Sequence, residues 1–259
     1  MTPTDAAFGA APEPAAPAAP EPGLASLHPA YFALVMATGI VSIACQILGL
    51  GWAARALFVV NLIAYPALWG LTIARIARHR ARFFADLSHH GRAVGFFTVV
   101  AATSVLGSQA LLVAGAVRPA IALWAAAIAL WALLTYVIFT LLTIKPTKPP
   151  LAEGLNGGWL VAVVAAQSVA VLGAQIVPQL EASARGVAAL FCLAMWLGGG
   201  MLYFWIIGLI FYRYTFFPMS PADLAPPYWI NMGAAAISTL AGANLALAAP
   251  ASPTIAALP

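Results

Sequence analysis

One stretch, residues 159–177, restricts the possible folds of this chain more than any other. It reads WLVAVVAAQSVAVLGAQIV and contains no charged residue. It is long and apolar enough to cross the hydrocarbon core of a bilayer as an α-helix. It also carries Gln167, Ser168, Gly173 and Gln175, and polar residues inside a membrane usually face a neighbouring helix or a water-filled path. We therefore expect a transmembrane helix that is surrounded by other helices.

Three segments share a pattern in which a glycine is followed two residues later by Gln or Asn. They are SVLGSQ at 104–109, AVLGAQ at 170–175 and TLAGAN at 239–244. The glycines are 66 residues (107 to 173) and 69 residues (173 to 242) apart, and Gly39, in the looser match ATGIVS, lies 68 residues before Gly107. A period of this length holds two membrane crossings, so the predicted repeat unit is a helical hairpin. The alternative is that Gly and Ser are simply common in packed membrane helices.

The composition is that of an integral membrane protein. Charged residues make up 7% of the 259 residues and hydrophobic residues 63%. Long apolar runs predict helices rather than a β-barrel, so the expected fold class is all-α. The net charge of +4 does not indicate nucleic-acid binding, because the basic residues do not gather with aromatic residues in a patch. Cys45 and Cys192 fall inside predicted spans and are interpreted as small apolar residues.

Seven apolar segments are predicted to cross the membrane. They lie at about 29–50, 53–76, 94–116, 119–144, 159–177, 186–212 and 228–249. Pro66 predicts a kink in the second of them. Residues 1–24, rich in Ala and Pro, are predicted to be disordered, which leaves 25–259 as the membrane domain. The charged segment 77–95 is predicted to be a loop.

The repeated small and polar residues lie on the odd-numbered spans, whereas the even-numbered spans are bulkier and more aromatic. We expect the odd spans to line a central pore and the even spans to face lipid, where aromatic residues usually serve packing or the membrane interface. The predicted pore-lining residues are Thr38, Gly39, Ser42, Gln46, Ser104, Gly107, Ser108, Gln109, Gln167, Ser168, Gly173, Gln175, Ser238, Thr239, Gly242 and Asn244.

Regular helix geometry limits which of these residues can face one path. Gly107 and Gln109 are two residues apart, about 200° around a helix, whereas Ser104, Gly107 and Ser108 share a face. Either the glycine lines the path while the glutamine packs on a neighbouring helix, or the reverse holds.

The basic residues predict the orientation of the chain. With the N-terminus inside, the inner loops hold eight of them, and the outer loops hold three, Arg55, Arg118 and Arg185. Because Lys and Arg are enriched in cytoplasmic loops, the N-terminus is predicted to be cytoplasmic. The expected location is the plasma membrane, which is the inner membrane in a bacterium.

The distribution of charge favours anions as the cargo. All seven carboxylates fall outside the predicted spans, and all eleven Lys and Arg residues fall outside them or within about three residues of their ends. A proton pump or cation carrier, in contrast, normally buries a carboxylate or His along its path. Hydroxyl and amide donors and helix N-termini can stabilise an anion.

We find no catalytic or cofactor motif, so we expect no enzyme, no cofactor and no metal. His79, His89 and His90 are interpreted as part of a solvated basic loop.

Four segments carry a family resemblance. They are HPAYFALVMATGIVSIACQILGL from His28, GLNGGWLVAVVAAQSVAVLGAQ from Gly154, WLGGGMLYFWIIGLIFYR from Trp196, and FFPMSPADLAPPYWINMGAAAISTLAGA from Phe216. Together they resemble the tellurite-resistance/dicarboxylate transporter family, which includes fungal malate and sulfite transporters and the slow anion channels of plant guard cells. The resemblance runs from about residue 28 to residue 244.

The resemblance implies five helical hairpins, or ten helices, around a central pore. It implies that the odd helices line the pore, that the protein forms a homo-oligomer, a trimer, with one pore in each protomer, and that the cargo is a dicarboxylate such as malate, sulfite or an inorganic anion. This chain departs from the family because only seven spans are present. The family's pore-blocking Phe lies on the ninth helix, so no Phe of this chain is assigned as a gate.

We therefore expect the chain to be a C-terminally truncated member whose ring of helices stays open on one side. Such a chain is not expected to transport by itself unless oligomerisation closes the ring. Two functions remain from the sequence: transport of small anions, by a channel or a carrier, and a membrane protein or remnant without transport activity. Anion flux in vesicles distinguishes them.

Overall fold

The computed structural model describes residues 23–219, 221 and 226–251. The predicted disordered tail falls outside the described residues up to position 22, and Leu24 begins the first short turn. Seven helical segments of the described chain are long and apolar enough to cross a membrane, which confirms the seven predicted spans and the all-α membrane fold.

The α-helices are α1 (Ala33–Ile47), α2 (Gly51–Leu87), α3 (His90–Ala93), α4 (Phe97–Leu112), α5 (Val117–Ile144), α6 (Leu151–Gly154), α7 (Val161–Ile176), α8 (Ala182–Phe216) and α9 (Ile230–Ala248). The 3₁₀ turns are η1 (Leu24–Ser26), η2 (Pro29–Phe32), η3 (Val94–Phe96), η4 (Gly157–Leu160), η5 (Val177–Gln179), η7 (Pro226–Trp229) and η8 (Ala249–Ala251).

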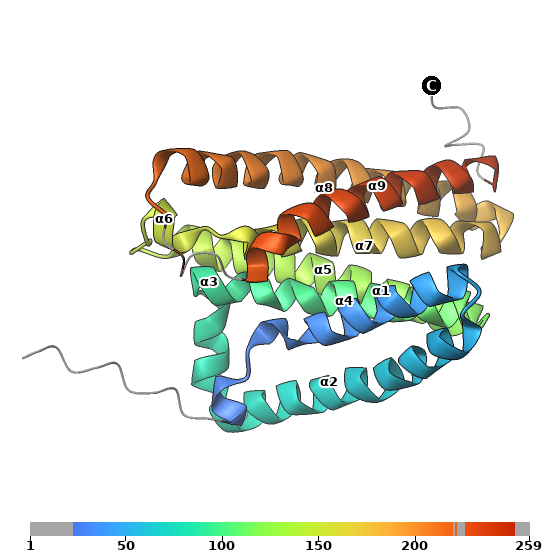
Figure 1. Ribbon diagram of the computed structural model, residues 1–259, viewed down its shortest axis with the longest axis horizontal. Helices are drawn as coiled ribbons and strands as arrows, with labels where there is room; N and C mark the ends of the chain where they lie inside the picture. The colour runs from blue at the N-terminus through green and yellow to red at the C-terminus, as the bar shows by residue number, and fades with distance from the viewer. Residues whose placement is uncertain (1–22, 220, 222–225, 252–259) are drawn as a thin grey trace, which may run out of the picture.

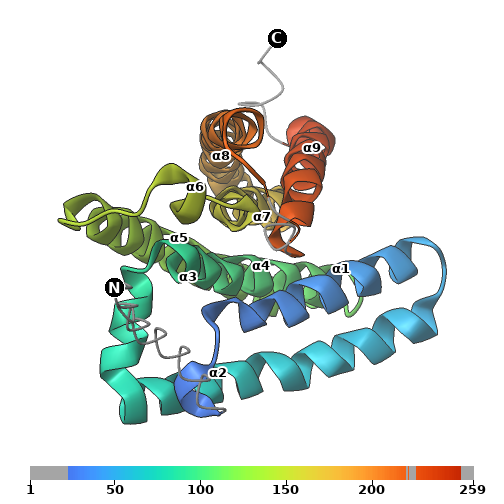
Figure 2. The ribbon, with the colours of Figure 1, turned by 60° about the vertical axis from the view of Figure 1, so that its left-hand side comes forward.

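Four helices form an inner row. α1 packs on α4, α4 on α7 and α7 on α9, so that α1 and α9 stand at the two ends of the row (Figures 1 and 2). The longer helices α2, α5 and α8 lie outside, each packed on the inner helix that precedes it in the chain. Over their most apolar 18 residues, the spans that contain α4 and α7 are 94% buried, whereas the other spans are 11–22% buried. The expected inner position is therefore confirmed for the third and fifth spans.

Each inner helix begins with a 3₁₀ turn that carries an aromatic residue. The turns η2, η3, η4 and η7 precede α1, α4, α7 and α9 and contain Phe32, Phe96, Trp159 and Trp229. Successive spans run in opposite directions, so the four inner helices are parallel and begin at the same end of the bundle, the left-hand end of Figure 1. A hairpin repeat accounts for both features, because each inner helix then occupies the same position in its unit.

Trp124 joins the outer helix α5 to the inner helix α7 at a glycine of the sequence repeat. A Cβ added to Gly173 would lie 2.8 Å from the Trp124 ring, so the ring rests directly on the α7 backbone. The indole Nε1–H donates a hydrogen bond of 3.0 Å to the carbonyl of Val169, one helical turn before the glycine. The glycine is thus the residue that lets the ring approach.

Trp196 repeats this contact one hairpin later. It lies on α8 against Gly242 of α9, where an added Cβ would be 2.9 Å from the ring. Its Nε1–H donates to the carbonyl of Ser238 at 2.9 Å, again one turn before the glycine. In both cases the outer helix of one hairpin holds the inner helix of the next.

The prediction of a loop at 77–95 is wrong over most of that segment. α2 continues to Leu87, and the short helix α3 and the turn η3 follow at once. The backbone of α2 leaves helical dihedral angles at His79 (φ −134°, ψ 41°), and Pro66 lies within the regular part of the helix. Beyond His79 the chain turns steeply away from the main axis of α2 (Figure 1). We refer to residues 80–87 as the arm.

Replacing Gly173 by Ala tests the contact between tryptophan and glycine. The added methyl group would press on Trp124 and on Cys192 of α8, and both lie on packed helices. Overpacking of this kind costs about 1–3 kcal/mol, so we expect a lower melting temperature for the purified protein in detergent. Gly198→Ala is the control, because nothing among the described residues lies within 4 Å of its added Cβ. A Gly173→Ala variant that melts no lower than Gly198→Ala would contradict the role of the contact.

Candidate functional site

The predicted pore residues differ in burial according to their helix. Those of the two central helices are buried, with one half-buried member: Ser104, Gly107, Ser108, Gln109, Gln167, Ser168 and Gly173 are buried and Gln175 is half-buried. Those of the two end helices are more exposed: Gly39 and Ser42 are buried, Thr38, Gln46, Ser238, Gly242 and Asn244 are half-buried, and Thr239 is exposed. The α4 and α7 groups lie on adjacent helices, and these two helices stand between the α1 group and the α9 group in the row.

Gln109 binds a buried residue that sequence reasoning did not select. Asn61 of α2 is fully buried, and its Nδ2 donates to Gln109 Oε1 at 2.7 Å and to the carbonyl of Val35 at 2.9 Å. Gly39 of α1 lies beside this pair, since a Cβ there would be 3.0 Å from Asn61 Nδ2. The repeat glutamine of α4 therefore joins three helices.

Several of the other predicted polar residues bind helix backbone. Gln167 Nε2 donates to the carbonyl of Trp196 on α8 at 3.1 Å, and the Ser42 hydroxyl donates to the carbonyl of Ala54 on α2 at 2.7 Å. The Ser168 hydroxyl donates to a carbonyl of its own helix. The three predicted polar residues of α9 do the same, and they are Ser238, Thr239 and Asn244.

Ser104 presents a buried hydroxyl without a partner. The residue is 1% exposed, and its Oγ has no hydrogen-bond partner among the described residues. Leaving a buried polar group unpaired is costly, so such a group needs a water molecule, an ion or a functional reason. Ser108 lies one turn further along the same face of α4. These two hydroxyls form a short polar strip in the middle of the bundle.

The beginnings of the inner helices touch one another. A Cβ on Gly95 of η3 would lie 3.1 Å from the backbone nitrogen of Ala30 in η2, and one on Gly157 of η4 would lie 3.0 Å from the Cα of Tyr228 in η7. Gly158 of η4 lies near Val94 of η3 in the same way. Four helix N-termini therefore meet at one end, and each carries a positive partial charge of about half a unit from the aligned peptide dipoles.

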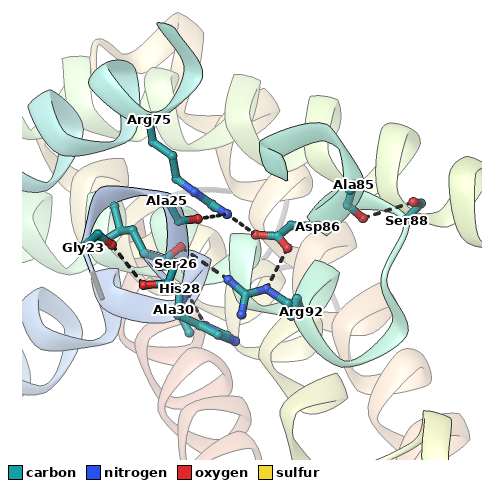
Figure 3. A network of polar contacts seen from close by, with 11 residues as sticks. Gly23, Ala25, Ser26, His28, Ala30, Arg75, Ala85, Asp86, Ser88 and Arg92 are labelled. Carbon is teal, nitrogen blue, oxygen red and sulfur yellow. Dashed lines mark hydrogen bonds and ion pairs between the residues drawn. The ribbon is translucent and has the colours of Figure 1, made fainter. Parts of the chain in front are cut away.

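A buried ionic network lies at this same end (Figure 3). Asp86 of the arm is 8% exposed and accepts from two arginines, Arg75 Nη2 and Arg92 Nε, each at 2.7 Å. Arg75 also donates to the carbonyl of Ala25, and Arg92 donates to that of Leu27, so the network holds the chain that precedes α1. Two guanidinium groups share one carboxylate, which leaves one net positive charge.

His28 completes the cap of the first inner helix without adding charge. Its Nδ1 accepts a hydrogen bond from the backbone nitrogen of Ala30. Burial lowers the pKa of His28, and the neighbouring Arg92 lowers it further. The imidazole therefore stays neutral at neutral pH, as a hydrogen-bond acceptor at Nδ1 must.

A second buried arginine, Arg213, lies at the end of α8. It is 5% exposed, and its Nε donates to the carbonyl of Ala152 at 2.8 Å, while Nη1 donates to the Tyr228 hydroxyl. It thus connects α8, α6 and the start of α9.

The basic residues of the whole bundle gather at this end. Eight of the eleven Lys and Arg residues belong to its segments: Arg75, Arg78, Arg80, Arg82, Arg92, Lys145, Lys148 and Arg213.

This arrangement favours an anion chemically. The inner helices α1, α4, α7 and α9 contain no charged residue, and the helix ends and arginines make one end of them electropositive. Within the described parts of the chain, no three His, Cys, Asp or Glu side chains are placed to hold a metal ion.

The two contacts between tryptophan and glycine left a signal in the sequence, and the buried position of Asp86 did not. Trp124 and Trp196 precede Gly173 and Gly242 by 49 residues (124 to 173) and 46 residues (196 to 242), a regular offset that a comparison of the repeats would have found. The buried state of Asp86 left no such signal, because its neighbours in sequence are those of an exposed basic segment.

Comparison with known proteins shows that the chain is similar to membrane transport proteins. The model of the voltage-dependent anion channel family matches residues 26–258. An uncharacterized transporter of Methanocaldococcus jannaschii is 24% identical over 209 residues, which are 78% of this chain and 60% of that protein. A sulfite efflux pump of Trichophyton rubrum is 27% identical over 210 residues, which are 76% of this chain and 56% of the pump. An uncharacterized membrane protein of Mycobacterium tuberculosis is 50% identical over 44 residues, which are 17% of this chain and 22% of that protein. The first two matches thus reach only 60% and 56% of the relatives' own length. No solved structure matches the chain significantly.

Asp86→Asn tests whether the ionic network holds this end together. The change leaves Arg75, which is 3% exposed, without its carboxylate, and removing one partner of a buried pair typically costs about 3–5 kcal/mol. We expect a large fall in the melting temperature in detergent. Arg92→Gln should cost less, because Arg75 keeps its partner and the Arg92 side chain is 30% exposed. Glu181→Gln, at an exposed position, is the control, and equal melting of this control and Asp86→Asn would exclude a stabilising network.

Proposed function

Because this chain belongs to the voltage-dependent anion channel family, we propose that it carries small anions across a membrane along its inner helices. The observation that carries this proposal is the convergence of four parallel, uncharged helices at an end that holds three arginines. Arg75 and Arg213 are buried there, and Arg92 is half-buried. An anion near this end gains favourable electrostatic energy, whereas a cation finds no carboxylate along the inner helices to replace its water.

We place the path along the polar faces of α4 and α7. Ser104 and Ser108 share one face of α4, and Ser168 and Gln175 are two turns apart on α7 and share a face there. The unpaired hydroxyl of Ser104 supports this choice, since a passing anion or its water would accept from it. The glycines Gly107 and Gly173 would serve the path indirectly by allowing neighbouring helices to approach.

We propose a small oxyanion as the cargo. Hydroxyl groups and helix N-termini bind oxyanions by directed hydrogen bonds and need no fixed positive charge in the membrane interior. The similarity to a sulfite efflux pump supports sulfite as the first anion to test. A dicarboxylate such as malate offers the same acceptor atoms and belongs in the same assay.

We further propose that the electropositive end faces the cytoplasm and that the active form is a homo-oligomer. The orientation follows from the eight basic residues at that end against three at the other. A membrane-impermeant thiol reagent added to one side of the membrane would locate a cysteine at Ser88 and so decide the orientation. Cross-linking in the membrane would decide between the trimer suggested by the family and a monomer.

Thiol labelling in vesicles tests the path. Single cysteines at Ser104 and Ser108, in a chain with Cys45→Ala and Cys192→Ala, should react with a small water-soluble thiol reagent, because reaction requires the thiolate and hence water. A cysteine at Ala132, on the exposed surface of α5, should react at least about tenfold more slowly because it faces hydrocarbon. Equal labelling of Ala132→Cys and Ser104→Cys would remove the basis for a water-filled path beside α4.

Sulfite flux tests the alternative of a membrane protein without transport activity. Vesicles with the 259-residue chain are compared with vesicles that lack protein. A saturable flux would exclude the alternative. Labelled Ser104 without flux would show a water-filled path that does not carry sulfite, and neither labelling nor flux would favour the alternative.

A further inference from the structure

A cavity of about 340 Å³ lies outside the inner row, between α2 and α5. Its walls come from the segment before α1, from α2 and its arm, from the start of α4, and from one side of α5, and they are almost entirely apolar. Three of the wall residues on α5, Leu130, Leu134 and Val137, recur at helical spacing. The volume is at the lower end of the range for ligand pockets.

Among the described wall residues, one fully buried polar atom lacks a hydrogen-bond partner. Arg75 lines the cavity, and the Arg75 Nε has no hydrogen-bond partner in the described structure although the side chain is only 4% exposed. Arg75 Nη2, in contrast, donates to Asp86 and to the carbonyl of Ala25 (Figure 3). The Thr72 hydroxyl, also in the wall, already donates to the carbonyl of Leu68. An apolar cavity with an unpaired buried donor in its wall fits an amphiphile.

A basic rim stands beside this donor. The arm contributes Phe83 and Phe84 to the cavity wall, and Arg80 is one helical turn before them. Arg78 and Arg80 are exposed. Aromatic residues beside exposed arginines are typical of segments that lie in the headgroup region of a membrane.

We propose that this cavity holds one acyl chain of an anionic phospholipid. The chain fills the apolar space, an ester or phosphate oxygen accepts a hydrogen bond from Arg75 Nε, and the headgroup phosphate lies near Arg78 and Arg80. We expect a phospholipid because the cavity lies between α2 and α5, two helices that are largely exposed on the outside of the bundle. Over their most apolar 18 residues, the spans that contain α2 and α5 are only 11% and 17% buried. The positive rim selects an anionic lipid over a zwitterionic one.

Native mass spectrometry of the purified 259-residue chain in detergent tests this site. The protein is titrated with dioleoyl phosphatidylglycerol and, separately, with dioleoyl phosphatidylcholine. We expect one tightly bound phosphatidylglycerol per chain and weaker binding of phosphatidylcholine. Equal binding of the two lipids would overturn the assignment of the basic rim.

Two sets of variants locate the lipid. Leu134→Trp fills the cavity from α5 and should reduce phosphatidylglycerol binding about tenfold, whereas Ala132→Trp adds the same ring on the exposed side of the same helix and should leave binding unchanged. Thr72→Phe fills the cavity from α2 and serves if Leu134→Trp does not fold. Each of Arg78→Gln and Arg80→Gln should weaken phosphatidylglycerol binding about fivefold and leave phosphatidylcholine binding unchanged.

Arg75→Lys tests the free donor itself. It keeps a cation for Asp86 and removes the Nε–H, so the melting temperature should be nearly unchanged while phosphatidylglycerol binding falls.

Undiminished phosphatidylglycerol binding to both cavity-filling variants, Leu134→Trp and Thr72→Phe, would overturn the proposal. Loss of an oligomer in Leu134→Trp, with no lipid bound to the unmodified chain, would show instead that a second copy of the chain occupies the cavity.

Discussion

The contact between a tryptophan of an outer helix and a glycine of the next inner helix is the interaction on which this bundle depends. Helices in a bilayer gain little from burying apolar surface against one another, so close packing and hydrogen bonds must hold them. Trp124 on Gly173 and Trp196 on Gly242 supply both, since each ring reaches the helix backbone and each indole N–H binds a carbonyl there. Because each contact joins one hairpin to the next, the two contacts set the order of α4, α7 and α9 in the inner row.

This order explains the electrostatics of the bundle. When hairpins repeat with the same hand, every inner helix points the same way, and the positive ends of their dipoles add at one end instead of cancelling. The buried arginines lie at that same end, and Asp86 neutralises only one of the pair that it binds. The result is a set of uncharged inner helices with one positive end, which suits a small anion without placing a fixed charge in the hydrocarbon region.

The sequence predicted the parts of the fold that follow from local periodicity. The seven spans, the all-α class and the inner position of the third and fifth spans are confirmed, because span length and small-residue content are properties of each segment alone. The segment 77–95 was predicted wrongly because its helix depends on tertiary contacts. The carboxylate of Asp86 pairs with Arg75 across eleven residues (75 to 86), and the bend at His79 brings them together.

The candidate path was predictable only in part for a different physical reason. Small and polar residues serve both helix contacts and water-filled paths, so residue type alone does not separate the two. Gln109 binds Asn61, and Gly173 receives Trp124, yet Ser104 belonged to the same sequence motif and has an unpaired hydroxyl. The partner on the neighbouring helix decides the role, and no pattern within α4 or α7 reveals that partner.

The relative reactivity of one buried cysteine toward anionic and cationic reagents tests the central claim most directly. Ser104→Cys, in vesicles and in a chain without other cysteines, is treated with a negatively charged and a positively charged methanethiosulfonate. The same ratio of rates is measured for Ser183→Cys, an exposed position at the opposite end of the bundle. A positive entrance predicts that the anionic reagent is favoured at position 104 by about tenfold or more over the reference, and that Arg213→Gln lowers this preference. A ratio at position 104 equal to or below that at position 183 would contradict an anion path through the inner helices.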